Sequence, residues 1–162
     1  AMAPTWALLG CVLLLPSLRG DPDGCGPGWV RTPGGCLGFF SRELSWSRAE
    51  SFCRRWGPGS HLAAVRSAAE LRLLAELLNA SRGGDGSGEG ADGRVWIGLH
   101  RPAGSRSWRW SDGTAPRFAS WHRTAKARRG GRCAALRDEE AFTSWAARPC
   151  TERNAFVCKA AA

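Results

Sequence analysis

A basic segment, residues 122–132, holds the densest group of side chains in this sequence that could do chemistry. It reads His-Arg-Thr-Ala-Lys-Ala-Arg-Arg-Gly-Gly-Arg and contains no carboxylate. The planar guanidinium of arginine pairs with planar oxyanions through two N–H groups, and glycines let the backbone approach an array of oxygens. The segment therefore predicts an anion-binding surface made of Arg123, Lys126, Arg128, Arg129 and Arg132. A solvated, flexible loop without a ligand is the alternative.

The chain as a whole is also basic. It has 162 residues and a formal net charge of +9, and of its 23 basic residues only Lys126 and Lys159 are lysines. Such an arginine excess favours an anionic partner with ordered oxygens, although codon usage that enriches Arg, Ala, Gly and Pro together would give the same bias. With 43% hydrophobic residues and nine tryptophans, the chain can form a packed core.

The N-terminal region and the cysteines indicate secretion. Residues 6–18 form an almost unbroken apolar run that is too short to span a bilayer and is typical of a signal peptide. We expect residues 1–20 to be cleaved and residues 21–162 to form one secreted domain with no membrane span. The six cysteines after residue 20 predict three disulfides, but their spacing alone does not choose the pairing. The sequence contains no Cys-x-x-Cys pair, so the cysteines do not indicate a metal site.

In the first half of the mature chain the sequence predicts turns and two helices, and in the second half it predicts short strands. Glycines and prolines between Cys25 and Cys36 predict a small hairpin, followed by a strand over 36–40. Ser47-x-x-Glu50 predicts the start of a helix that runs through residue 55. Ser67-x-x-Glu70 predicts a second helix, and its apolar face recurs at helical spacing over Leu71, Leu74, Ala75 and Leu78. Further strands are expected at 95–99, 107–110, 132–136 and 155–158, an α+β pattern.

Four motifs in this order resemble the C-type lectin-like domain family: Trp96-Ile97-Gly98-Leu99, Trp110-Ser111-Asp112-Gly113, Phe118-x-x-Trp121 and Phe156-Val157-Cys158. The resemblance covers residues 25–158 and implies two helices, two small antiparallel sheets and a long irregular loop region. It also implies three disulfides, Cys25–Cys36, Cys53–Cys158 and Cys133–Cys150. Within the family the chain is most similar to the avian eggshell-matrix members, which implies calcium carbonate mineralisation.

The resemblance also implies that a calcium site has been lost. The family's calcium-dependent sugar site uses Glu-Pro-Asn or Gln-Pro-Asp in the long loop and then Trp-Asn-Asp. Here the loop is the basic segment, and the later motif reads Trp145-Ala146-Ala147. Because Ca²⁺ takes six to eight oxygen ligands, we expect no metal there, and no cofactor elsewhere.

A glycine-rich acidic segment, residues 83–93, is expected to be an exposed, mobile loop. Asn79-Ala80-Ser81 is an N-glycosylation sequon, and Ser87-Gly88-Glu89 fits a secretory-pathway phosphorylation pattern, with Ser81 as a weaker phosphorylation candidate. Weak contacts to calcium on a crystal surface could come from acidic residues in this loop and from a second acidic cluster, namely Asp85, Glu89, Asp92 and Asp138-Glu139-Glu140.

These observations favour binding rather than catalysis. His61, His100 and His122 lack a nucleophile pattern or metal-ligand spacing, so no enzyme is expected. The leading hypothesis is a secreted, extracellular-matrix protein that binds calcium carbonate and alters its nucleation and growth. The alternative is a module for anionic glycans, such as sulfated or bacterial surface polysaccharides, with a role in antimicrobial defence. Nucleic acid is not an expected partner of a secreted disulfide-bonded domain.

Overall fold

The computed structural model describes residues 24–82, 93–124 and 126–161. The expected signal peptide over 1–20, and Ser87 with most of the acidic glycine-rich segment, lie outside these residues. Within them, no helix is long and apolar enough to cross a membrane.

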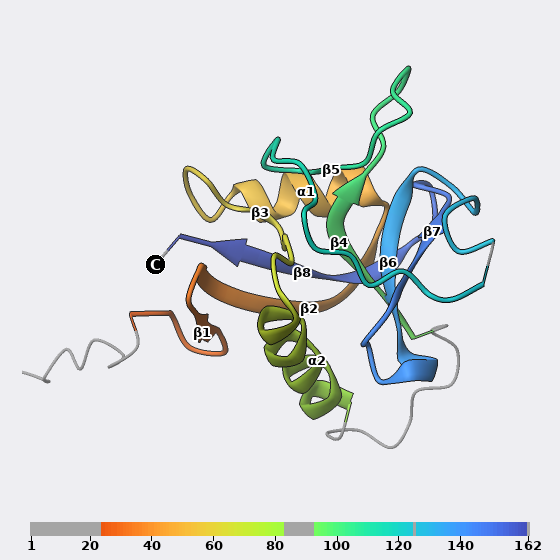
Figure 1. The fold of residues 1–162 in the computed structure, drawn as a ribbon. Helices are drawn as coiled ribbons and strands as arrows, with labels where there is room; N and C mark the ends of the chain where they lie inside the picture. The colour runs from red at the N-terminus through yellow and green to blue at the C-terminus, as the bar shows by residue number, and fades with distance from the viewer. Residues whose placement is uncertain (1–23, 83–92, 125, 162) are drawn as a thin grey trace, which may run out of the picture.

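Two helices and eight strands make up the described chain (Figure 1). In order they are β1 (Val30–Thr32), β2 (Gly35–Leu44), α1 (Trp46–Arg54), β3 (His61–Leu62), α2 (Ala68–Arg82), β4 (Arg94–His100), β5 (Arg109–Trp110), β6 (Cys133–Arg137), the 3₁₀ turn η1 (Asp138–Glu140), β7 (Trp145–Arg148) and β8 (Asn154–Ala160).

The strands form one mixed sheet in the order β1-β2-β8-β4-β6-β7, with β3 added to β8 and β5 to β4. All neighbours are antiparallel except β4 and β8, which run parallel and pair Val95 with Ala155 and Trp96 with Phe156. The resemblance implies two separate antiparallel sheets, but this short parallel pair joins the antiparallel parts into one mixed sheet. The α+β fold with two helices and a long loop region after β5 agrees with that expectation.

Strand β4 is buried on both faces. Its five central residues are all buried, because Val95, Ile97 and Leu99 pack in a core cluster with α2, whereas Trp96 packs in a second cluster with α1. Helix α2 buries the expected face of Leu71, Leu74, Ala75 and Leu78. Its predicted cap is also present, since the backbone N–H of Glu70 donates to the Ser67 hydroxyl over 3.1 Å.

The predicted start of the first helix is wrong. The residue at the N-cap of α1 is Ser45, without a side-chain capping bond, rather than Ser47. Tertiary contacts explain the difference, because the Trp46 indole N–H donates to the carbonyl of Ile97 over 2.9 Å. Glu50 is buried and accepts the backbone N–H of Leu62 over 3.1 Å, so its carboxylate is not used as a cap. Strand β3 was not expected, since two residues are too few to show an alternating pattern.

Three disulfides connect the cysteines in the pairs that the resemblance implies. Cys25–Cys36 closes the first hairpin over a separation of 11 residues. Cys53–Cys158 joins α1 to β8 over 105 residues. Cys133–Cys150 joins the start of β6 to the segment that follows β7, over 17 residues.

The long-range disulfide should contribute most to stability, because the loss of chain entropy grows with loop length. We expect Cys53→Ala/Cys158→Ala to lower the free energy of unfolding by about 4–5 kcal/mol, and Cys25→Ala/Cys36→Ala by about 3 kcal/mol. Urea denaturation of the two double variants measures the difference. Equal losses would contradict the assignment of the larger effect to loop length.

Candidate functional site

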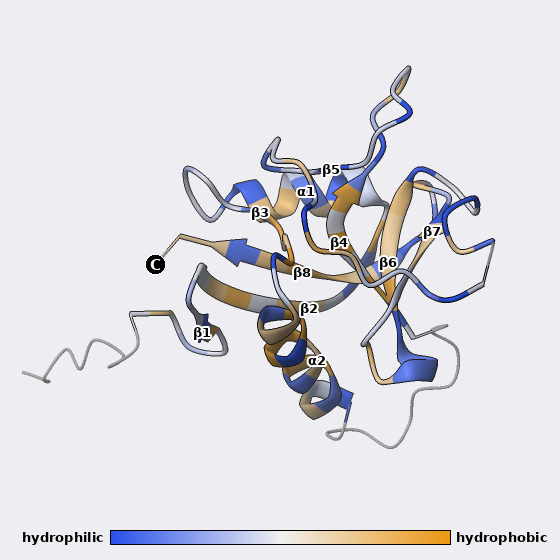
Figure 2. Cartoon of the chain, viewed as in Figure 1, coloured by the Kyte–Doolittle hydropathy of each residue, from blue (hydrophilic) through white to orange (hydrophobic). Residues whose placement is uncertain are grey.

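The predicted anion-binding residues lie on one exposed loop, the basic loop (122–132), next to β7 in Figure 1. Figure 2 shows this part of the chain as mainly hydrophilic beside the apolar strand β6. Ala127 is buried and anchors the loop, because its carbonyl accepts the backbone N–H of Ala147 over 2.6 Å. The five predicted cations, Arg123, Lys126, Arg128, Arg129 and Arg132, are all exposed.

The two glycines of the basic loop serve its packing against β7. A Cβ atom at Gly130 would lie 2.2 Å from the carbonyl oxygen of Ala147, and one at Gly131 would lie 2.1 Å from that of Arg148. Only glycine allows so close an approach of two backbone segments. The sequence-based reason for these glycines, access of the backbone to a ligand, is therefore replaced by a structural one.

A group of packed rings, the aromatic platform, lies beneath the loop. Its centre is Trp145 of β7, which is fully buried, with three rings meeting it edge-on at centroid distances of 6.1 to 6.3 Å. Trp108 meets Trp121 at 4.8 Å on its outer side. The platform thus consists of Trp108, Trp110, Phe118, Trp121 and Trp145.

Two arginines lie over outer rings of the platform. The guanidinium of Arg128 lies 5.5 Å from the Trp121 ring centroid, and that of Arg101 lies 5.6 Å from the Trp108 centroid. Arg101 also donates its backbone N–H to the carbonyl of Arg132 over 2.7 Å, and Arg132 donates from its side chain to Pro102 over 3.1 Å. Cation–π contacts and these bonds restrict the arginines, so the loop is more ordered than a solvated charge run.

Arg101 is a residue that sequence reasoning missed. It lies outside the basic segment, and no local pattern distinguishes it from the other arginines. Its proximity to Trp108 along the chain offers only a weak signal, because its contact with Arg132 depends on how the loop folds back.

The cations of the basic loop have no ion-pair partner among the residues that the structure describes. Within the described part of the chain, no carboxylate lies at ion-pair distance from any of the five.

The three carboxylates of η1, in contrast to these cations, all have ion-pair partners. Asp138 pairs with Arg82 at 3.2 Å, Glu139 pairs with Arg137, and Glu140 pairs with His122 at 2.8 Å. A hydrogen bond from Ser144 and the neighbouring His122 hold the pKa of Glu140 below its usual range. These paired carboxylates are poorer candidates for calcium contact than the sequence suggests.

Of the two segments in which the family resemblance implies calcium ligands, β7 carries no oxygen-bearing side chain and the basic loop carries no carboxylate. In β7, Trp145 and Ala147 point into the protein and Ala146 is partly buried. Across the described residues, no group of three His, Cys, Asp or Glu side chains lies close enough together to hold a metal ion.

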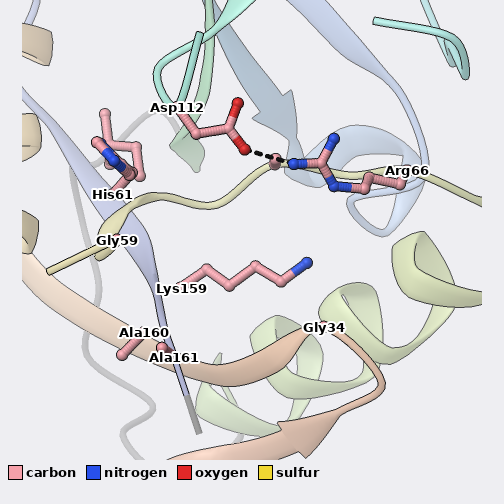
Figure 3. Close-up of a pocket in the computed structure, with 10 residues that line it drawn as sticks. Gly34, Gly59, His61, Arg66, Asp112, Lys159, Ala160 and Ala161 are labelled. Atoms are coloured by element: carbon pink, nitrogen blue, oxygen red, sulfur yellow. Dashed lines mark hydrogen bonds and ion pairs between the residues drawn. The ribbon is translucent and has the colours of Figure 1, made fainter. Parts of the chain in front are cut away.

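A separate cavity of about 150 Å³ lies between β3, the turn after β5 and β8 (Figure 3). Three basic side chains border it, and each is paired with a carboxylate. His61 meets Glu50 at 2.6 Å, Lys159 meets Glu70 at 3.4 Å, and Arg66 pairs with Asp112. The cavity therefore has no uncompensated charge to attract an anion, in contrast to the basic loop.

Two proposed modification sites lie near the end of α2. Asn79 is exposed and donates its side-chain amide to the carbonyl of Ala141 over 3.1 Å. Ser81 is also exposed and donates its hydroxyl to the carbonyl of Leu77 over 2.8 Å. Together with Ser87 outside the described residues, they stay predictions.

Comparison with known proteins assigns the family. Residues 42–160 match the model of the Lectin C-type domain. The chain belongs to this C-type lectin family. Its fold, its three disulfides and its ordered motifs are those that the sequence resemblance implies.

Its relatives include avian eggshell proteins. The chain is 99% identical over 142 residues to ovocleidin-17 of Gallus gallus, covering 88% of this chain and all of the relative. It is 46% identical over 140 residues to rheacalcin-2 of Rhea americana, covering 86% and 97%. The crystal structure of Gallus gallus ovocleidin-17, described as a major protein of the eggshell calcified layer, matches with a TM-score of 0.78 over 86% of this chain and all of that one.

We expect no tight calcium binding at the position of the family's site. Calorimetric titration with Ca²⁺ should show no site tighter than about millimolar, because β7 and the basic loop offer repulsive charge and no carboxylate. A micromolar one-to-one transition that disappears when the basic loop is mutated would overturn this prediction.

The Arg66–Asp112 pair should make stability sensitive to acid. Burial raises the pKa of Asp112, but hydrogen bonds from Thr114 and the Arg66 guanidinium outweigh it, so the pKa lies below its usual range. A depressed pKa means that the ionised carboxylate stabilises the fold above the usual value of about 4, and that this contribution is lost as the pH falls below it.

Asp112→Asn should therefore lower the free energy of unfolding at pH 7 by about 1 kcal/mol or less, since the pair is partly exposed. It should also reduce the loss of stability between about pH 5 and pH 2. Urea denaturation across this range measures both effects. Glu76→Gln, an exposed change on α2, is the control, and the same acid dependence in both variants would show that the Asp112 pair does not contribute.

Proposed function

We propose that this is a secreted, non-enzymatic matrix protein that binds calcium carbonate and modifies its nucleation and crystal growth. The single domain over 21–162 would act after removal of residues 1–20. The observation that carries the proposal is the basic loop: its five cations are exposed, none has a carboxylate of the described residues at ion-pair distance, and Arg128 lies over the aromatic platform. Similarity to ovocleidin-17, a protein of the eggshell calcified layer, supports the choice of mineral.

Carbonate suits arginine because both groups are planar. A guanidinium can direct two N–H groups at two oxygens of one carbonate, as it does with a carboxylate. One exposed contact of this kind is worth only about 0–1 kcal/mol and weakens with salt. Several contacts on one ordered surface add to one another, because the first contact raises the effective concentration of the rest. The disulfide Cys133–Cys150 supports such order, since Cys133 directly follows Arg132.

The histidines support a binding role rather than catalysis, since each has a structural contact. His61 bonds to Glu50, and His122 bonds to Glu140. His100 stacks on Trp46 with ring centroids 4.5 Å apart, and burial lowers its pKa.

Exchanging the arginines of the basic loop tests the proposal. Changing four arginines together to Lys keeps the charge but removes the planar guanidinium; the four are Arg123, Arg128, Arg129 and Arg132. We expect calcite affinity to fall and effects on crystal shape to weaken. The same four changed to Gln should weaken adsorption further and flatten its dependence on salt. Adsorption isotherms on calcite at graded salt measure both.

Four exposed arginines elsewhere provide a control with the same change of charge: Arg42, Arg72, Arg106 and Arg117, each to Gln. This control should retain most of the affinity. If the Lys variant adsorbs as well as the parent, net charge rather than planar pairing carries binding. If the Gln variant is unchanged, the basic loop is not the mineral surface. Binding to sulfated or bacterial polysaccharides without adsorption to calcite would favour the glycan alternative.

A further inference from the structure

A second surface of unusual composition lies far from the basic loop. Its centre is Trp56, which follows α1 and is 50% exposed. The Trp56 ring meets Trp29 edge-on at 5.0 Å and Phe40 at 6.0 Å, and Phe40 meets Phe52 at 4.9 Å. In Figure 1 the turn after α1 and the basic loop lie at opposite ends of the molecule. We name this surface the Trp56 patch: Trp29, Phe40, Phe52, Trp56, Arg48 and Arg55.

The base of the patch is rigid. Trp29 lies against β2 where that strand has a glycine, since a Cβ atom at Gly38 would come within 2.8 Å of the indole ring. Phe40 stacks on the buried Phe156 at 5.4 Å. Trp56 is therefore held by packed rings on its inner side, while half of its surface remains in contact with solvent.

Two exposed arginines, Arg48 and Arg55, neighbour Phe52, the ring between Arg48 and Trp56 along α1. Arg48, Phe52 and Trp56 follow one another at four-residue spacing and so lie along one side of α1 and its C-terminal turn. The guanidinium of Arg55 lies 5.9 Å from the Phe52 ring centroid. The nearby Glu50 is buried and bonds to Leu62 and His61. Within the described residues, neither Arg48 nor Arg55 has a carboxylate at ion-pair distance.

This combination differs from the basic loop in the chemistry it can recognise. Outer rings of the aromatic platform lie beneath the guanidinium groups of Arg101 and Arg128. In the Trp56 patch the indole of Trp56 is half exposed, and the guanidinium of Arg55 lies over the neighbouring Phe52 ring. The face of an exposed indole carries negative quadrupole density, which attracts the C–H face of a sugar ring, while nearby guanidinium groups pair with fixed anions.

We propose that the Trp56 patch binds a sulfated polysaccharide, with a sugar ring on Trp56 and sulfate groups on Arg48 and Arg55. Trp56 and Val30 are the large apolar side chains that the described chain leaves exposed. Two such residues give too little apolar area to anchor a membrane, whereas one ring suffices for a pyranose. Together with the proposed mineral surface, the patch would let one molecule connect a crystal to an organic polysaccharide.

Solution binding to chondroitin sulfate, with unsulfated chondroitin as its partner probe, tests the patch at about 0.15 M salt. We expect the parent to prefer the sulfated chain. Trp56→Ala should weaken that binding about tenfold without changing the charge, and Trp56→Phe should weaken it less. Arg48→Gln/Arg55→Gln should remove most of the preference for sulfate. Val30→Ala, a change at the other exposed apolar residue, is the control for Trp56→Ala.

Each outcome decides the proposal independently of the mineral surface. Equal binding of chondroitin sulfate by Trp56→Ala and the parent overturns it, as does equal binding of the sulfated and unsulfated chains. If the protein binds vesicles rich in phosphatidylglycerol in a way that depends on Trp56, and does not bind chondroitin sulfate, the patch is a membrane-binding surface instead. The Arg-to-Gln variant of the basic loop should still show the Trp56 effect. If the parent fails to adsorb to calcite, only the mineral proposal fails.

Discussion

The short parallel pairing of β4 with β8 is the constraint on which the rest of the domain depends. It places β4 in the interior, so the strand must be apolar on both faces, and the two helices cover one face each. The indole N–H groups of Trp46 and Trp96 complete this arrangement by donating to the carbonyls of Ile97 and Leu44. Cys53–Cys158 then fixes α1 to β8.

Charge is distributed unevenly on this frame, and the distribution matters more than the total. Carboxylates such as Asp112, Asp138 and Glu152 are paired with arginines. Despite burial, the pKa of Asp112 is lowered by hydrogen bonds from Thr114 and by Arg66, and the pKa of Glu152 is lowered by its pairing with Arg148. The excess arginines remain on the surface, where they face solvent. The positive charge therefore faces solvent, whereas much of the negative charge contributes to the stability of the fold.

Aromatic side chains give the exposed arginines a defined position in two places. Under the basic loop, the rings support guanidinium groups that lie over them, which suits a flat lattice of oxyanions. In the Trp56 patch the Trp56 ring is half exposed and Arg55 lies over the neighbouring Phe52 ring, an arrangement that suits a chain of sugar rings that carry anions. The two surfaces thus use the same residue types in different geometry, and their positions at opposite ends allow both to be occupied at once (Figure 1).

The sequence by itself determined the features that depend on neighbours along the chain. The apolar face and the N-terminal cap of α2 follow from the spacing of Leu71 to Leu78 and from Ser67. The positive charge of the basic loop and the absence of calcium ligands at Ala146 and Ala147 follow directly from the residue types. The ordered motifs were sufficient to indicate the family. Only the tertiary structure decided where α1 begins, that Glu50 is buried, that the acidic cluster is paired, and that Arg101 joins the basic loop. Each of these depends on a contact between residues far apart in sequence, such as Asp138 with Arg82 or Trp46 with Ile97. Local periodicity carries no information about such contacts, because they form only when the sheet has brought the segments together.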